Sequence, residues 1–148
     1  WSSDVCSSDL REKVEKQFKK NRTIAQNIFA VPGYVAAYTQ CDDYLEQLLP
    51  YLEENVRYLD KFLKDNMPKV KLVYPEATYL MWLDFTETGL RGDALADFVI
   101  NKAKVAVNRG DGFGIEGSNF VRLNIGCPRK TLTQGLKQIL EQYRKTGF

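Results

Sequence analysis

Histidine is absent from the 148 residues of this chain, and that absence excludes several kinds of chemistry. No histidine can act here as a general acid or base, activate a cysteine nucleophile or ligate zinc. Long apolar runs are lacking too, because no stretch approaches the roughly 20 residues that a transmembrane helix needs. The net charge is only +2 and the lysines are scattered, so the charge pattern does not indicate a nucleic-acid partner.

Cysteine is scarce as well. The chain has three cysteines, and Cys41 and Cys127 lie far apart, without the close spacing of a metal site. They form no disulfide framework, so a reducing cytoplasm is the expected compartment. Small, partly buried apolar side chains are the favoured interpretation of both. What remains is an ordinary globular composition, with 44% hydrophobic and 27% charged residues.

The first ten residues, Trp1–Leu10, differ from the rest of the sequence. Their string DVCSSDL matches one reading frame of a common sequencing-library adapter. They have neither the basic start nor the apolar core of a signal peptide. We expect these residues, Cys6 included, not to be native, and the true N-terminal part of the protein to be missing. The remainder has the length of one ordinary domain.

Helical patterns dominate the first half of that remainder. Residues 11–21 and 24–40 carry apolar side chains at helical spacing, although Pro32-Gly33 interrupts the second segment. Asp42-Asp43 predicts the start of a long amphipathic helix that ends near Asn66. At 1.5 Å per residue this helix would span about 40 Å, so we expect residues 11–66 to be a helical segment that bridges to another part of the protein.

The second half, residues 67–148, is predicted to be a small domain of strands and helices. The segments with strand character are 70–74, 78–85, 105–107 and 120–125, and those with helical periodicity are 93–104 and 132–143. Both faces of the second strand are mostly apolar, which predicts a central position in the sheet. We therefore predict an α+β fold, with a small antiparallel or mixed sheet of about four strands covered by helices.

Arg122 is the residue that points most directly to a function. It lies inside the apolar strand 120–125, which follows the glycine-rich loop Gly110–Gly117. An arginine in such a strand must find an anion or reach solvent, because an unpaired buried charge is costly. Its planar guanidinium fits a carboxylate through two parallel hydrogen bonds. The sequence therefore favours a carboxylate-binding site at Arg122.

The sequence also resembles a known family in four blocks that follow one another in the expected order. They are Ala36-Ala37-Tyr38, then Tyr44 through Asn55, then Pro75 through Phe85, and last Gly110-Asp111-Gly112-Phe113-Gly114 continuing through Arg122-Leu123-Asn124 to Arg129. These blocks resemble the C-terminal part of fold-type I pyridoxal-phosphate enzymes. Within that class the likeness is to the cystathionine β-lyase-like branch of class I/II aminotransferases, the MalY/PatB type.

The resemblance implies that Arg122 grips the α-carboxylate of an amino-acid substrate, and that pyridoxal 5'-phosphate is the cofactor of the full-length enzyme. It also implies that the lysine which forms the Schiff base lies upstream of Arg11, together with the other cofactor-binding residues. We therefore expect no catalytic, cofactor-binding or metal-binding residue in this chain, and no turnover by the chain alone.

Two further residues are candidates for the substrate site. Asn124 shares a strand face with Arg122, so it is either a partner that orients the guanidinium or a strand-end amide that satisfies nearby backbone. Tyr79 could line the substrate cleft, although an aromatic residue in a central strand more often belongs to the core. Gly112 and Gly114 permit close backbone approach or a positive φ, and a plain turn is the favoured interpretation of both.

The function that the resemblance implies for the parent protein is C–S β-lyase activity on cystathionine or related cysteine S-conjugates, by α,β-elimination. An amino-acid aminotransferase is the alternative. A second alternative is a non-catalytic α+β module that binds small carboxylates or a protein partner through Arg122. The family also implies a homodimer that acts on a small-molecule amino-acid substrate. The mild charge and the lack of a membrane-spanning run predict no nucleic-acid or membrane partner.

Overall fold

The computed structural model describes residues 8–21 and 27–148. Most of the predicted non-native tract, and the start of the helix expected from Ile24, lie outside the described residues. By its contacts the chain divides into two compact units, residues 1–45 and 46–148, and the division falls inside a helix. The sequence had instead suggested a boundary near Asn66. No helix among the described residues is both long and apolar enough to span a membrane.

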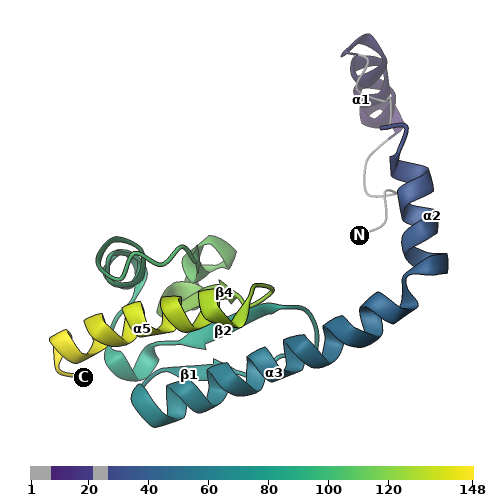
Figure 1. Ribbon diagram of the computed structural model, residues 1–148. Helices are drawn as coiled ribbons and strands as arrows, with labels where there is room; N and C mark the ends of the chain where they lie inside the picture. Colours follow the sequence, from purple (N-terminus) through teal and green to yellow (C-terminus); the bar gives the residue numbers. More distant parts are fainter. Residues whose placement is uncertain (1–7, 22–26) are drawn as a thin grey trace. The chain divides into compact units, whose positions relative to one another are not determined.

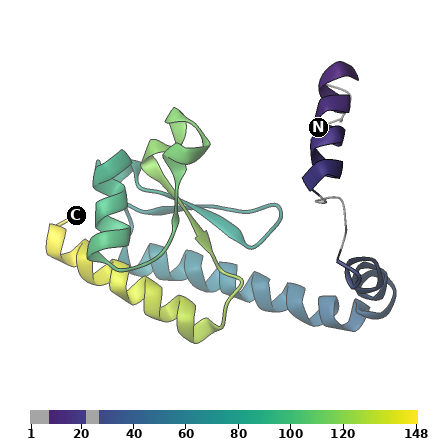
Figure 2. The same ribbon diagram turned by 90° about the horizontal axis from the view of Figure 1, so that it is seen from above.

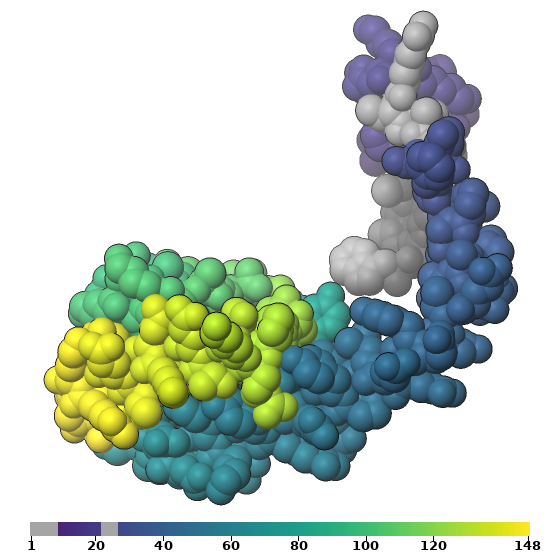
Figure 3. All heavy atoms as spheres, viewed as in Figure 1, coloured from purple at the N-terminus to yellow at the C-terminus, as the bar shows by residue number. Residues whose placement is uncertain are grey.

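The first unit contains helices α1 (Ser8–Asn21) and α2 (Ala30–Gln40) and the start of α3 (Asp42–Asn66). Helix α2 runs through Pro32-Gly33 without a break, because Pro32 occupies the first turn, where its missing N–H is not needed. No residue of α2 is buried, and atoms of this helix lie at the surface in Figure 3. The predicted interruption of this helix is therefore wrong.

Helix α3 has the predicted limits and length, 25 residues, and keeps Pro50 in its interior. Its apolar stripe becomes buried only in the second unit, at Val56, Leu59 and Leu63. That change explains why the contacts assign residues 46–66 to the second unit rather than to a separate linking segment.

The second unit is built on a four-stranded sheet with the order β1-β2-β4-β3 (Figure 1). The strands are β1 (Lys71–Val73), β2 (Leu80–Asp84), β3 (Asn108–Arg109) and β4 (Phe120–Asn124), and all neighbouring pairs are antiparallel. This arrangement confirms the predicted α+β fold and the central place of the second strand.

Helices α3 and α5 (Arg129–Thr146) run along one side of this sheet (Figures 1 and 2). Residues 81, 83, 121 and 123 alternate onto that side and are buried against the helices. The core is completed by Leu59 and Leu63 from α3, Leu136 and Ile139 from α5, and Phe85, Phe98 and Val99. The other face of the sheet carries the remaining side chains of β2 and β4, which are half-buried or exposed.

Three sequence predictions in this unit differ in detail. The third strand lies at 108–109 rather than 105–107, because the N–H of Val105 instead donates to the carbonyl of Val99 and closes the preceding helix. That helix divides into α4 (Gly92–Ala96) and a π-helical segment, Asp97–Lys102. Helix α5 begins at Arg129, directly after Pro128, and so starts three residues before the predicted segment 132–143.

Candidate functional site: an unpaired arginine on the open face of the sheet

Arg122 lies in the middle of β4, on the sheet face that α3 and α5 do not cover. Its neighbours Val121 and Leu123 are buried in the core, so the alternation of the strand directs Arg122 to the opposite face. It lies across from Trp82 of β2 and Asn108 of β3. The sheet thus holds the arginine between two other strands, which limits its backbone motion.

The contacts of the guanidinium leave part of its hydrogen-bonding capacity unused. Nη2 donates to Oδ1 of Asn108 at 3.2 Å, and Cζ lies 4.5 Å from the centre of the Phe113 ring. Nε is buried and has no hydrogen-bond partner among the described residues. Within those residues no Asp or Glu forms an ion pair with Arg122. A buried N–H without a partner is rare, and a carboxylate is the ligand that would satisfy it and balance the charge.

Two other arginines of the second unit differ from Arg122, because their guanidinium groups are already bound. Arg109 forms ion pairs with Asp93 and Asp111, and its hydrogen bonds lower the pKa of the Asp111 carboxyl below the ordinary value. Arg129 donates from Nε to Oδ1 of Asn55 at 2.6 Å and stacks on Tyr58, with Cζ 4.6 Å from the ring centre. Of the three, Arg122 alone has a buried donor without a partner in the described part of the chain.

The glycine-rich loop brings Phe113 to Arg122, and two of its glycines make the backbone contact that closes it. Gly110 and Gly117 pack backbone to backbone: a Cβ on Gly110 would lie 2.1 Å from the carbonyl oxygen of Gly117, and a Cβ on Gly117 would lie 2.2 Å from the carbonyl oxygen of Gly110. Gly114 has a φ of +135°, which side chains rarely permit. Gly112 has open space around it and no such φ. The loop is thus closed at its base, with Phe113 near its tip.

Asn124 and Tyr79 lie together, but around Gly126 rather than around Arg122. Oδ1 of Asn124 accepts a hydrogen bond from the N–H of Gly126 at 2.7 Å, and the carbonyl of Tyr79 accepts one from Ile125 at 2.9 Å. The Tyr79 ring packs beside Gly126 and is 47% exposed. The bond to Gly126 is what a strand-end amide satisfying local backbone would make. The guanidinium is held by Asn108 instead.

Asn108 and Phe113 are the site residues that sequence reasoning missed. Asn108 reaches Arg122 through the β3–β4 pairing, and β3 was expected three residues earlier. Phe113 was visible only as one letter of the glycine-rich loop. A register for the edge strand would have identified the first. No local pattern identifies the second.

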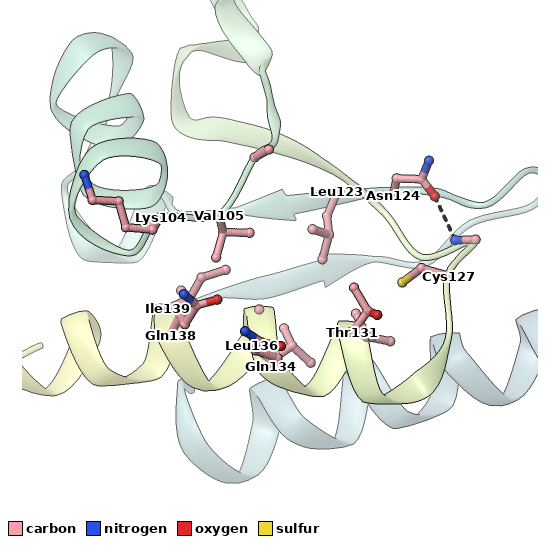
Figure 4. A pocket seen from close by; sticks show the side chains of 14 residues that line it. Lys104, Val105, Leu123, Asn124, Cys127, Thr131, Gln134, Leu136, Gln138 and Ile139 are labelled. Carbon is pink, nitrogen blue, oxygen red and sulfur yellow. Dashed lines mark hydrogen bonds between the residues drawn. The ribbon is translucent and has the colours of Figure 1, made fainter.

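A groove of about 400 Å³ opens on the helical side of the sheet, between the end of β4, α5 and the segment that follows the π-helical turn. Lys104 and Gln138 lie toward one end, and Asn124 and Cys127 toward the other (Figure 4). Arg122 does not line it. The groove is therefore separate from the surface on which the guanidinium lies.

A four-stranded antiparallel sheet backed by two helices, with a strand arginine beside a glycine-rich loop, is what the C-terminal part of a fold-type I pyridoxal-phosphate enzyme would provide. Comparison with solved structures supports this class. A pyridoxal-phosphate-bound protein of Clostridium difficile 630, described as an aminotransferase, superimposes with a TM-score of 0.79 and 36% identity, over 90% of this chain and 34% of that one.

Within that class the chain is related to the MalY/PatB type. It is 38% identical over 129 residues to the cystathionine beta-lyase PatB of Bacillus subtilis (strain 168), which is 87% of this chain and 33% of the relative. It is 35% identical over 118 residues to the protein MalY of Escherichia coli (strain K12), which is 80% of this chain and 30% of the relative. No family model matches the chain. The chain thus spans about a third of the length of the curated relatives it matches.

Proposed function

We propose that this chain supplies the substrate-carboxylate site of a pyridoxal-phosphate-dependent C–S β-lyase, with Arg122 as the binding residue. The observation that carries the proposal is the guanidinium on the open sheet face, whose buried Nε has no partner among the described residues. Because a carboxylate accepts two parallel hydrogen bonds from a guanidinium, binding there fixes its orientation as well as its position.

The substrate class follows from the relatives. The name of the B. subtilis protein specifies cystathionine β-lyase activity, so cystathionine and related cysteine S-conjugates are the proposed substrates. In the overall reaction the Cβ–S bond breaks and the sulfur leaves as a thiol, while water completes the conversion of the remainder to pyruvate and ammonia. Amino-acid transamination is the alternative, and the likeness to the C. difficile protein favours it. Both reactions need the same hold on the α-carboxylate.

The residues of this chain do not fit the covalent attachment of pyridoxal phosphate. A lysine that forms a Schiff base is activated in a desolvated pocket or beside another cation, whereas every lysine of this chain is exposed. The proposal therefore assigns substrate binding, and not cofactor attachment, to these residues. The same proposal includes a cytoplasmic homodimer for the whole enzyme, with residues 67–148 as its small C-terminal domain.

Arg122→Lys is expected to weaken carboxylate binding by about tenfold or more, because an ammonium cannot form the two parallel bonds of a guanidinium. The measurement is an NMR titration of the 148-residue chain, labelled with ¹⁵N at arginine, with L-alanine. It follows the Nε–H signal of Arg122, which is assigned by its loss in the variant, and amide signals of β4, which both proteins retain.

L-Alaninamide at the same ionic strength is the control ligand, because it keeps the amino group and lacks the carboxylate. Arg144→Lys is the control variant, since this exposed arginine lies in the last turn of α5. The proposal is wrong if L-alanine and L-alaninamide shift the Arg122 signal equally, or if Arg122→Lys binds L-alanine as the unchanged chain does.

Addition of pyridoxal phosphate to the chain is expected to give no Schiff base that survives dialysis. Exposed lysines react weakly and reversibly, so reduction with borohydride should leave substoichiometric label spread over several lysines. Absorbance after dialysis and peptide mass spectrometry after reduction make the measurement. Stoichiometric label on one lysine would contradict the assignment of cofactor attachment to residues outside this chain.

A further inference from the structure

Phe113 is an exposed aromatic side chain, although burial of so large an apolar group is usually favourable. The side chain is 55% exposed, on a loop closed by the backbone contact of Gly110 with Gly117. Its ring nevertheless has two specific neighbours. One is the Arg122 guanidinium, with Cζ 4.5 Å from the ring centre, and the other is Trp82, 5.3 Å away with the planes at 81°.

The Phe113 ring lies against the guanidinium, and no hydrogen bond joins the two side chains. A guanidinium directs its N–H groups within its own plane, while a cation–π contact uses the face of the aromatic ring. Phe113 therefore shields the cation without forming a hydrogen bond to it. Asn108 occupies Nη2, and the buried Nε remains without a partner in the described residues.

Trp82 makes this arrangement stiffer. It is the cross-strand neighbour of Arg122, it contacts Phe113 edge-on, and it also meets Phe120 edge-on at 6.2 Å. Aromatic pairs in this geometry contribute attraction beyond their buried area. The three rings and the guanidinium form one cluster on the open sheet face, and Phe113 is the member contributed by the loop.

We propose that Phe113 is a positioning residue for carboxylate binding, whose ring fixes the Arg122 guanidinium and excludes water from it. A fixed side chain loses less conformational entropy when a ligand binds. A partly desolvated cation also attracts a carboxylate more strongly. This inference rests on the proposed function, because it assigns to Phe113 a part of the affinity that Arg122 provides.

The test uses the same L-alanine titration on variants of the 148-residue chain. Phe113→Ala should raise the apparent Kd about threefold to tenfold, because it removes a partly desolvated cation–π contact of that strength. Phe113→Tyr keeps the aromatic face and should stay within about twofold of the unchanged chain. Phe113→Leu keeps apolar bulk without the π face and should fall between them. Ile115→Ala is the matched control, because Ile115 is on the same loop and 84% exposed.

A structural role alone would not give this order. If Phe113 merely filled space, Leu would replace it as well as Tyr. Equal binding by the Leu and Tyr variants, or unchanged binding by the Ala variant, overturns the inference. Where Arg122→Lys still weakens binding by about tenfold or more in the same series, the proposed function survives. Where it does not, the proposed function is the one that fails.

Discussion

Gly110→Ala is expected to destabilise the second unit by about 3 kcal/mol, at the upper end of the usual effect of overpacking. The new methyl group would lie 2.1 Å from the carbonyl oxygen of Gly117 and 2.6 Å from that of Phe120. Neither obstacle is a flexible side-chain end, so the backbone itself must move. The base of the loop would open, and Phe113 would leave the guanidinium. Urea unfolding gives the stability change, and near-UV circular dichroism reports the aromatic cluster.

Gly112→Ala is the matched control, two residues further along the same loop. Its Cβ meets nothing within 4 Å and its φ is not positive, so the change should stay within about 0.5 kcal/mol of zero. Equal urea midpoints for the two alanine variants would show that the contact of Gly110 with Gly117 does not close the loop.

Asn55→Ala is expected to reduce the free energy of unfolding by about 3 kcal/mol. Asn55 is fully buried. Its Nδ2 donates to the carbonyls of Ile125 at 3.0 Å and Cys127 at 3.2 Å, and its Oδ1 accepts from Nε of Arg129. Alanine would remove these three bonds, and only the carbonyl of Cys127 would keep another donor, the hydroxyl of Tyr51. Each buried polar group that loses its partner costs about 1–3 kcal/mol, and partial access of water reduces the sum.

Asn101→Ala serves as the comparison, since it removes an asparagine whose amide makes an exposed hydrogen bond to Asp97 at 3.1 Å. Its effect should stay within about 0.5 kcal/mol. Both variants can be followed by urea unfolding of the 148-residue chain. A similar small effect at both positions would mean that solvent replaces the bonds of Asn55, contrary to its complete burial.

The regular elements of this fold could be predicted from the sequence because their signals are local. The apolar stripe of α3 and the two-sided apolar character of β2 each need only a short window of residues, and both were predicted correctly. Features that depend on the opposite strand were not. The edge strand β3 was placed three residues early, because only pairing with β4 selects Asn108-Arg109 over the apolar residues that precede it.

In the candidate site too, the residue with a local signal was predicted and the residues placed by other parts of the chain were not. Arg122 was identified because a charge inside an apolar strand stands out in sequence and the motif around it has a family likeness. Its partners were not, because Asn108 reaches it through strand register and Phe113 through the closure of a loop. The predicted role of Asn124 as a partner of the guanidinium stays untested, although its side chain bonds to Gly126.

The connection that follows β4 is fastened to α3 at several points. Besides the bonds of Asn55, the Tyr51 hydroxyl donates to the carbonyl of Cys127 at 3.2 Å and accepts from the N–H of Arg129 at 2.9 Å. The strand that carries Arg122 is thus anchored just beyond its end to the middle of a long helix. A displacement of the β4 backbone is therefore expected to carry the bonded turns of α3 with it, because those hydrogen bonds join the two elements.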